Sequence, residues 1–173
     1  MSQKRKQQAV DKEEKRLSES AIARIHSASN MEDRLKVIQS FAKIKNSWVD
    51  EVLCQALDDK CEKIRDYIIK ELAKREELNL NLLFKKLPTS PWYVKSSIMR
   101  VLAILKQEQT IQHIEYIFEE PNADVRANAA FALGEIGGSD SIRLLTQLLN
   151  DKNKFVRKSA AKALSKVSHI KFT

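Results

Sequence analysis

The stretch PNADVRANAAFALGEIGG, residues 121–138, decides the fold. It opens with a proline, which is common at the start of a helix, and closes with two glycines, which commonly end one. Between them lies Arg126, followed within six residues by four alanines, at positions 127, 129, 130 and 132. Small side chains allow helix axes to approach closely, because the interaxial distance depends on the side chains at the contact. The stretch therefore predicts a helix that packs tightly against its neighbours.

The same pattern recurs along the chain when Arg126 is used as an anchor. Steps of 30 or 31 residues reach five basic anchors: Arg34, Arg65, Lys95, Arg126 and Arg157. Three, four and seven residues after each anchor stands an apolar residue, and eight after it stands a small one. This spacing puts the four positions on one face of a helix.

A second helix is predicted before each anchor. The residue twelve positions before every anchor is apolar, and so is the one eight before, except for His26 in the first unit. Ser90 and Asn122 are expected to cap the third and fourth anchor helices, with Pro91 in the first turn of the third. Gly137 and the glycine after it are expected to end the fourth, and Asp151 with Asn153 is expected to open the fifth.

Each unit is thus a pair of helices, and one pair cannot bury its apolar face alone, so the pairs must stack. The sequence predicts an all-α, right-handed α-solenoid of about five helix pairs. A basic extension that is either disordered or helical is expected to precede them. The predicted boundaries are 1–17 for the extension and about 18–46, 47–77, 78–108, 109–139 and 140–170 for the units.

Two of these units resemble HEAT repeats, specifically the short type named after phycobilisome lyases. The residues that carry the resemblance are Val125-Arg126, Ala129-Ala130, Leu133-Gly134 and Ile136, and again Val156-Arg157, Ala160-Ala161, Leu164 and Val167. The resemblance is strong over residues 109–168, moderate over 47–108 and weak over 18–46. It implies a scaffold whose concave surface, formed by the anchor helices, holds a partner. A minority of similar proteins are enzymes or enzyme subunits, including bilin lyases, DNA glycosylases and a metal hydroxylase.

The resemblance also implies a role for the anchors. In such families the basic anchor forms a polar ladder with acidic residues, and Asp59 and Asp151 match the acid that precedes the turn. We therefore interpret the anchors as a structural ladder. Lys95 departs from the pattern because it lacks the bidentate fork of arginine.

Composition indicates the class of partner. The net charge of +8 and the pI of 9.5 favour an acidic partner, which can be nucleic acid, anionic lipid or an acidic protein.

Cys54 and Cys61 are too few for a disulfide framework. The chain has no apolar run of membrane-span length, and its head lacks the apolar core of a secretory signal. A cytoplasmic protein with reduced thiols is expected.

The sequence offers no catalytic constellation. His26, His113 and His169 fall in different units, and no metal, phosphate or dinucleotide motif is present. A glycosylase would need a carboxylate beside aromatic residues in a basic groove, and Glu62 with Trp92 is a poor match for that arrangement. We predict a protein that is not an enzyme and has no cofactor or metal. A lyase-type enzyme or enzyme subunit remains an alternative, because the repeats of such enzymes have few sequence motifs by which the activity can be recognised.

A basic track is the main candidate for a binding surface. Its last part has lysines four residues apart on one helix: Lys154, Lys158, Lys162 and Lys166. Corresponding positions in earlier anchor helices carry Lys43, Lys70, Lys74 and Arg100, whereas Phe131 and Glu135 interrupt the track. Lysines usually solvate an exposed helix face. The alternative is a concave surface for an anionic partner.

Trp92 and Tyr93, at the start of the third anchor helix, have two interpretations. They either pack over the neighbouring unit or anchor a partner, since both residue types are enriched in binding hot spots. The predicted function is a non-enzymatic scaffold or adaptor that binds a protein partner within a larger assembly in the cytoplasm. The main alternative is a nucleic-acid-binding protein that uses the basic track.

Overall fold

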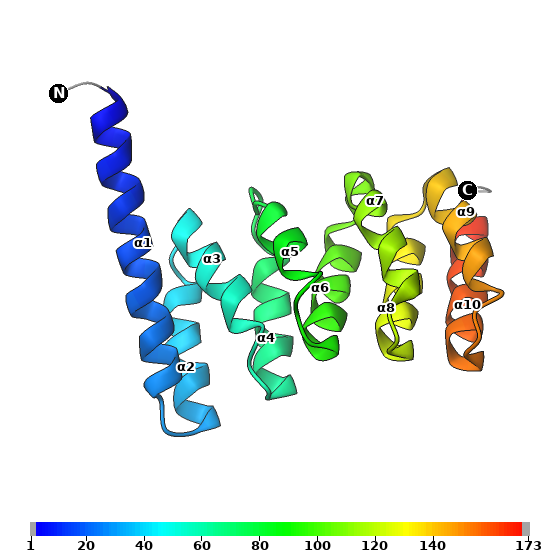
Figure 1. The fold of residues 1–173 in the computed structure, drawn as a ribbon, viewed down its shortest axis with the longest axis horizontal. Helices are drawn as coiled ribbons and strands as arrows, with labels where there is room; N and C mark the ends of the chain where they lie inside the picture. The colour runs from blue at the N-terminus through cyan, green and yellow to red at the C-terminus, as the bar shows by residue number, and fades with distance from the viewer. Residues whose placement is uncertain (1–2, 171–173) are drawn as a thin grey trace. The chain divides into compact units, whose positions relative to one another are not determined.

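The structure is a computed structural model that describes the backbone of residues 3–170 and the side chains of residues 3–167. These residues form helices and no strand. The α-helices are α1 Gln3–Ser27, α2 Met31–Ala42, α3 Ser47–Ala56, α4 Glu62–Leu72, α5 Asn81–Lys86, α6 Trp92–Leu105, α7 Ile111–Ile114, α8 Ala123–Ile136, α9 Gly138–Leu148 and α10 Lys154–Ile170. They follow one another as five pairs along the chain (Figure 1). The predicted all-α solenoid class is confirmed.

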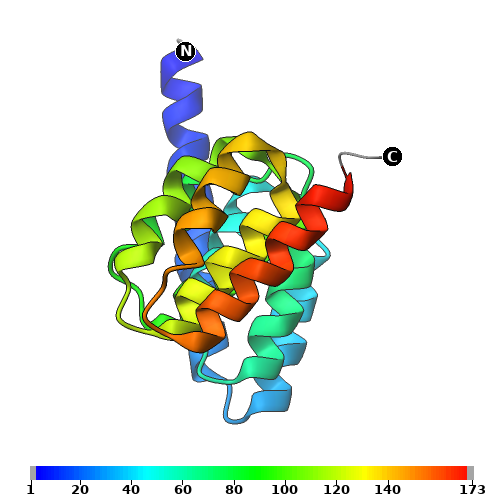
Figure 2. The ribbon, with the colours of Figure 1, turned by 90° about the vertical axis from the view of Figure 1, so that its right-hand side faces the viewer.

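The chain divides into two compact units, Met1–Leu83 and Phe84–Thr173. In the first unit, α1 packs against α2 and α3, and α4 packs against α2 and α3. In the second unit, α8 packs extensively against both α6 and α10, and α9 covers α8 and α10. Figure 2 shows α10 running alongside α8. The anchor helices α6, α8 and α10 therefore form one continuous layer within the second unit.

The core follows the periodic positions of the sequence. The third residue after the anchor is fully buried in the inner pairs, as Ile68, Ile98 and Ala129, and so is the seventh in the same pairs. In the last pair Ala161 is exposed, although its column is buried in all the preceding pairs, and Leu149 is exposed, although Leu57 and Leu87 of its column are buried. Among the described residues no further helix pair packs against α9 and α10, which accounts for this exposure.

The helix predicted before the fourth anchor is not a regular α-helix. It consists of the short α7 between two 3₁₀-helices, η1 Glu108–Thr110 and η2 Glu115–Glu119. Its buried isoleucines, Ile111, Ile114 and Ile117, are spaced by three residues. That spacing suits the three residues per turn of a 3₁₀-helix, because all three side chains then point to the core.

Three of the expected helix ends are found, and one differs. Asn122 caps α8, and its side chain accepts a hydrogen bond from the backbone N–H of Asp124 at 2.8 Å. Gly137 ends α8 with a φ of 75°, a conformation that glycine adopts without strain. Asn153 accepts from the N–H of Phe155 at 2.8 Å at the start of α10. Ser90, by contrast, is not a cap: α6 begins one residue later, with Pro91 at the N-cap.

The N-terminal extension is helical where it is described. Helix α1 runs without a break from Gln3 to Ser27, so no joint separates the extension from the first predicted unit at residue 17. The first buried side chain of α1 is that of Ser18, which donates to the carbonyl oxygen of Trp48 at 3.1 Å. The preceding residues form an exposed, charged helix.

Candidate functional site

The anchor Arg126 has the most complete set of contacts. Its side chain is 2% exposed, and the guanidinium donates to both carboxylate oxygens of Asp151, at 2.7 and 3.0 Å. The remaining nitrogen donates to the carbonyl oxygens of Glu120 and Pro121, in the turn before α8. Asp151 also accepts from the N–H of Asn153 at 2.7 Å. One side chain thus ties the turn before α8 to the turn before α10.

The other anchors make part of this pattern. Arg34 donates to Asp59 at 2.8 Å, and Lys95 forms an ion pair with Glu120. These two acids, like Asp151, stand 25 residues after their anchors. Arg65 and Arg157 each donate to two carbonyl oxygens of the turn before their own helix, at distances between 2.7 and 3.1 Å. Each anchor therefore contacts a turn, an acid of the next pair, or both.

Buried pairing shifts the pKa of the charged groups. Hydrogen bonds from Arg126 lower the pKa of Asp151, and burial opposes them only in part. The hydrogen bond to Asp151 raises the pKa of Arg126, and the bond to Asp59 raises that of Arg34. These shifts favour the charged forms, as expected for hydrogen-bonded ion pairs.

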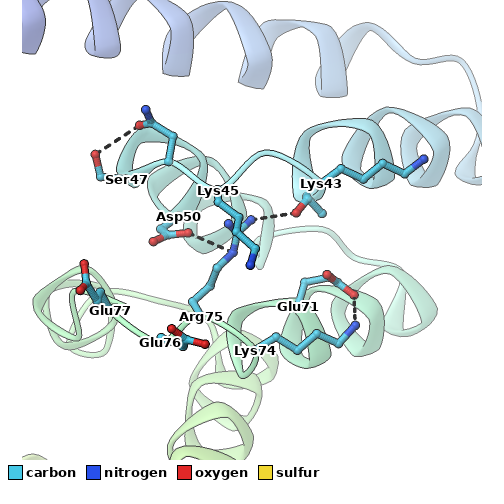
Figure 3. A pocket seen from close by; sticks show the side chains of 11 residues that line it. Lys43, Lys45, Ser47, Asp50, Glu71, Lys74, Arg75, Glu76 and Glu77 are labelled. Atoms are coloured by element: carbon cyan, nitrogen blue, oxygen red, sulfur yellow. Dashed lines mark hydrogen bonds and ion pairs between the residues drawn. The ribbon is translucent and has the colours of Figure 1, made fainter.

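A hollow of about 480 Å³ lies at the ends of α2 and α4 (Figure 3), and two of the three basic candidates of the first unit line it. Lys43 and Lys74 line it, and Lys74 pairs with Glu71 at 2.6 Å. Lys70 is exposed but does not line the hollow. Because Glu71 and two further glutamates share this surface, it is mixed in charge rather than basic.

Arg75 closes one side of this hollow, and the sequence patterns did not single it out. It donates to the carbonyl oxygens of Ala42 and Ile44, at 3.0 and 2.8 Å, just where α2 ends. Its Nε lies 3.2 Å from Asp50 of α3, as Figure 3 shows. Arg75 therefore connects the end of α4 to both α2 and α3.

The basic binding candidates of the second unit lie on the anchor helices α6 and α10. Lys154, Lys158, Lys162 and Lys166 are exposed along α10, and Arg100 is half-buried on α6. Lys166 forms an ion pair with Glu135 of α8, which also lies 3.3 Å from Lys106 at the end of α6. Both hydrogen bonds lower the pKa of Glu135, that of Lys166 most. The carboxylate thus neutralises part of the track that the sequence predicted.

Apolar side chains are exposed on the same layer. Phe131 of α8 is 48% exposed and Ile104 of α6 is 51% exposed. Phe131 borders a hollow of about 530 Å³ between α8 and α10, with Lys162 and Lys166 on the opposite side. Gly134 and Ala163 also line it, and they are in such close contact that a Cβ on Gly134 would stand 2.7 Å from that of Ala163. The small residue at the eighth position permits this approach.

The aromatic candidates lie at the start of α6. Trp92 is 51% exposed, whereas Tyr93 is half-buried, and their rings meet edge to face with centroids 5.9 Å apart. Trp48 contacts Phe41 in the same way at 6.0 Å. Trp92 and Tyr93 do not line the hollow beside Phe131. The structure therefore does not bring the aromatic and basic candidates into one site.

The histidines are dispersed. His26 is exposed, and His113 stacks on Phe84 with ring centroids 3.7 Å apart. His169 falls outside the described side chains. In the described part of the chain no cluster of three metal-ligating side chains is found. The described helices also include none that is both long and apolar enough to cross a membrane.

A family model matches part of the chain. Residues 112–171, about a third of the sequence, match the model described as HEAT repeats. A comparison with curated proteins gives no match.

One solved structure shares the helical arrangement of this chain with a TM-score above 0.5. The complex of CpcE and CpcF of phycocyanin lyase from Nostoc sp. PCC7120 aligns with a TM-score of 0.60 and 21% identity. The alignment covers 88% of this chain but 65% of that one, so this chain spans less than two thirds of its length. Two engineered proteins align over 90% of this chain at 17% and 16% identity, covering 92% and 93% of theirs, but with TM-scores of 0.47. At this identity the lyase structure bears on the fold alone.

Proposed function

We propose that this HEAT-repeat chain is a non-enzymatic scaffold that binds a protein partner within a larger assembly. One observation carries the proposal: Phe131 is half-exposed at the edge of a hollow on the anchor-helix layer. Large apolar side chains that border a concave surface are typical of protein-binding sites. The similar lyase structure is itself a complex of CpcE and CpcF, which agrees with a role in assembly.

A protein suits this surface better than nucleic acid does. Phosphate binding needs several cations without acidic neighbours, because the phosphate contacts supply most of the affinity. Here Glu135 pairs with Lys106 and Lys166, so fewer unpaired cations remain on this layer for the phosphates of a nucleic acid. Ile104 of α6, which stands nine residues after its anchor as Glu135 does in α8, is exposed and adds apolar area to the same layer.

Site-specific photo-crosslinking in cells tests the proposal. A benzophenone amino acid replaces Phe131 in one variant and Val10 in the other, because Val10 of α1 is similarly exposed, at 51%. We expect a protein adduct of defined mass from position 131 and none of that mass from position 10. Mass spectrometry then identifies the partner, which would also reveal an enzyme subunit if the lyase-type alternative holds.

Two outcomes would contradict the scaffold. A nuclease-sensitive adduct from position 131 would show that the surface binds nucleic acid. Equal adducts from both positions would show that contact at Phe131 is not specific.

A further inference from the structure

Two lysines beside the hollow carry charges that the fold does not use. Lys158 and Lys162 are exposed on α10, and neither has an ion-pair partner among the described residues. Their neighbour Lys166, one turn further on, is held by Glu135. Like charges four residues apart destabilise a helix slightly. The pair therefore offers a local positive field that an anion outside the chain can neutralise.

The lining of the hollow next to these lysines is partly apolar. Phe131, Gly134 and Ala163 line it, together with Ser159, Ser165 and the carboxylate of Glu135, which pairs with Lys166. Lys162 and Lys166 also line it, and their methylene stems add apolar surface beneath their ammonium groups. Its volume of about 530 Å³ exceeds that of one side chain, so a leucine or phenylalanine can enter.

The spacing of Lys158 and Lys162 suits a helical ligand. Four residues of an α-helix rise by about 6 Å, so the backbones of Lys158 and Lys162 are that far apart along α10. A partner helix that lies along α10 presents carboxylates at the same interval when its acids are four residues apart. An apolar residue three or four positions beyond the second acid then reaches the hollow, whose lining on α10 extends from Ser159 past Lys162 to Lys166.

We propose that the hollow between α8 and α10 binds an acidic amphipathic helix of the partner protein. Carboxylates at positions i and i+4 pair with Lys158 and Lys162, and an apolar side chain at i+7 or i+8 enters beside Phe131. This inference rests on the proposed function and adds the chemistry of the partner. Charge complementarity favours this occupant: residues 84–173 contain fourteen lysines and arginines against eight acids, so most of the net charge of +8 belongs to this unit.

Selection from a random library of displayed 16-residue peptides tests the proposal. The full chain is the target, and a Phe131→Glu variant removes peptides that bind elsewhere. We expect enriched peptides with acids four residues apart followed by a leucine, isoleucine or phenylalanine. Their affinity is then measured by fluorescence anisotropy for the wild type and for the double variant Lys158→Glu, Lys162→Glu.

The control variant Lys63→Glu, Lys85→Glu changes the net charge equally at two exposed lysines away from the hollow. We expect the affinity to fall about tenfold or more in the first double variant and less than about twofold in the control. Circular dichroism verifies that both variants are folded, as their exposed positions imply.

Four results would overturn the acidic helix. The selection can yield nothing, or peptides without paired acids, or peptides that bind the Lys158→Glu, Lys162→Glu variant as well as the wild type. A 16-nucleotide single-stranded RNA that displaces the peptides at a lower concentration than the unlabelled peptide does would also overturn it. If crosslinking at position 131 still captures a protein in these cases, the scaffold stands and the partner chemistry alone is wrong.

Discussion

Replacing Arg126 with methionine tests whether the anchors stabilise the stack. Methionine fills much of the same space but donates no hydrogen bond, so the contacts to Asp151, Glu120 and Pro121 are lost together. The side chain of Asp151 is 6% exposed and would remain buried with the N–H of Asn153 as its protein donor. Breaking a buried ion pair on one side costs about 3–5 kcal/mol. Because Asp151 keeps one partner, we expect a loss at the lower end, about 3 kcal/mol.

Urea unfolding followed by circular dichroism at pH 7 measures this loss. The denaturant slope should stay constant, since a changed slope would mean that the repeats no longer unfold together. Arg157→Met is the matched control, because Arg157 donates to two carbonyl oxygens and its loss leaves no buried carboxylate. The double variant Arg126→Met, Asp151→Asn should regain part of the stability by removing the stranded charge. A loss below about 1 kcal/mol for Arg126→Met, the size of a surface pair, would refute the structural role of the anchor.

Three further changes have defined outcomes. Gly134→Ala should lower the melting temperature. Overpacking against Ala163 costs about 1–3 kcal/mol, which exceeds the gain in helix propensity of about 1 kcal/mol. The double variant Gly134→Ala, Ala163→Gly should restore the melting temperature. Glu135→Gln should cost at most about 1 kcal/mol at pH 7. The two flanking lysines lower the folded pKa of Glu135, so its contribution is present above the unfolded pKa of about 4.3 and is lost as the pH falls through the folded value. The urea midpoints of variant and wild type should therefore approach each other as the pH falls below the unfolded pKa, and a gap that stays constant or widens with falling pH would contradict this. Arg75→Ala should speed amide hydrogen exchange in the last turn of α2. The substitution removes two hydrogen bonds to carbonyl oxygens at the end of α2 and the ion pair with Asp50. Unchanged exchange would show that these bonds do not stabilise the turn.

The sequence was sufficient for features that repeat. Ile68, Ile98 and Ala129 could be assigned to the core because their spacing from the anchors recurs, and burial of apolar residues depends on that spacing. The end of α8 at Gly137 was also predictable, because a residue with positive φ favours glycine. Such features depend on local chain geometry, which short sequence patterns record.

Features that depend on how helices approach one another were not predictable. Arg75 stands outside the repeated columns, and its contacts with α2 follow from the packing of α2 beside α4. Glu135 seemed to interrupt a basic track, but it pairs with lysines of both neighbouring helices. A signal was present in the case of Glu120, which stands 25 residues after Lys95, as Asp151 does after Arg126. The interval of 25 residues becomes visible only when the two basic–acidic pairs are compared.

The constant interval between anchor and acid limits where the chain can change in length. Arg34, Lys95 and Arg126 each reach a carboxylate 25 residues further on, so the number of residues between the two groups is fixed by the bond. One residue inserted into α8 or α9 would rotate Asp151 away from Arg126, since each helical residue turns by about 100°. Duplication of a whole helix pair would instead preserve every interval. The bond therefore favours growth of such a protein by complete repeats over growth by single insertions.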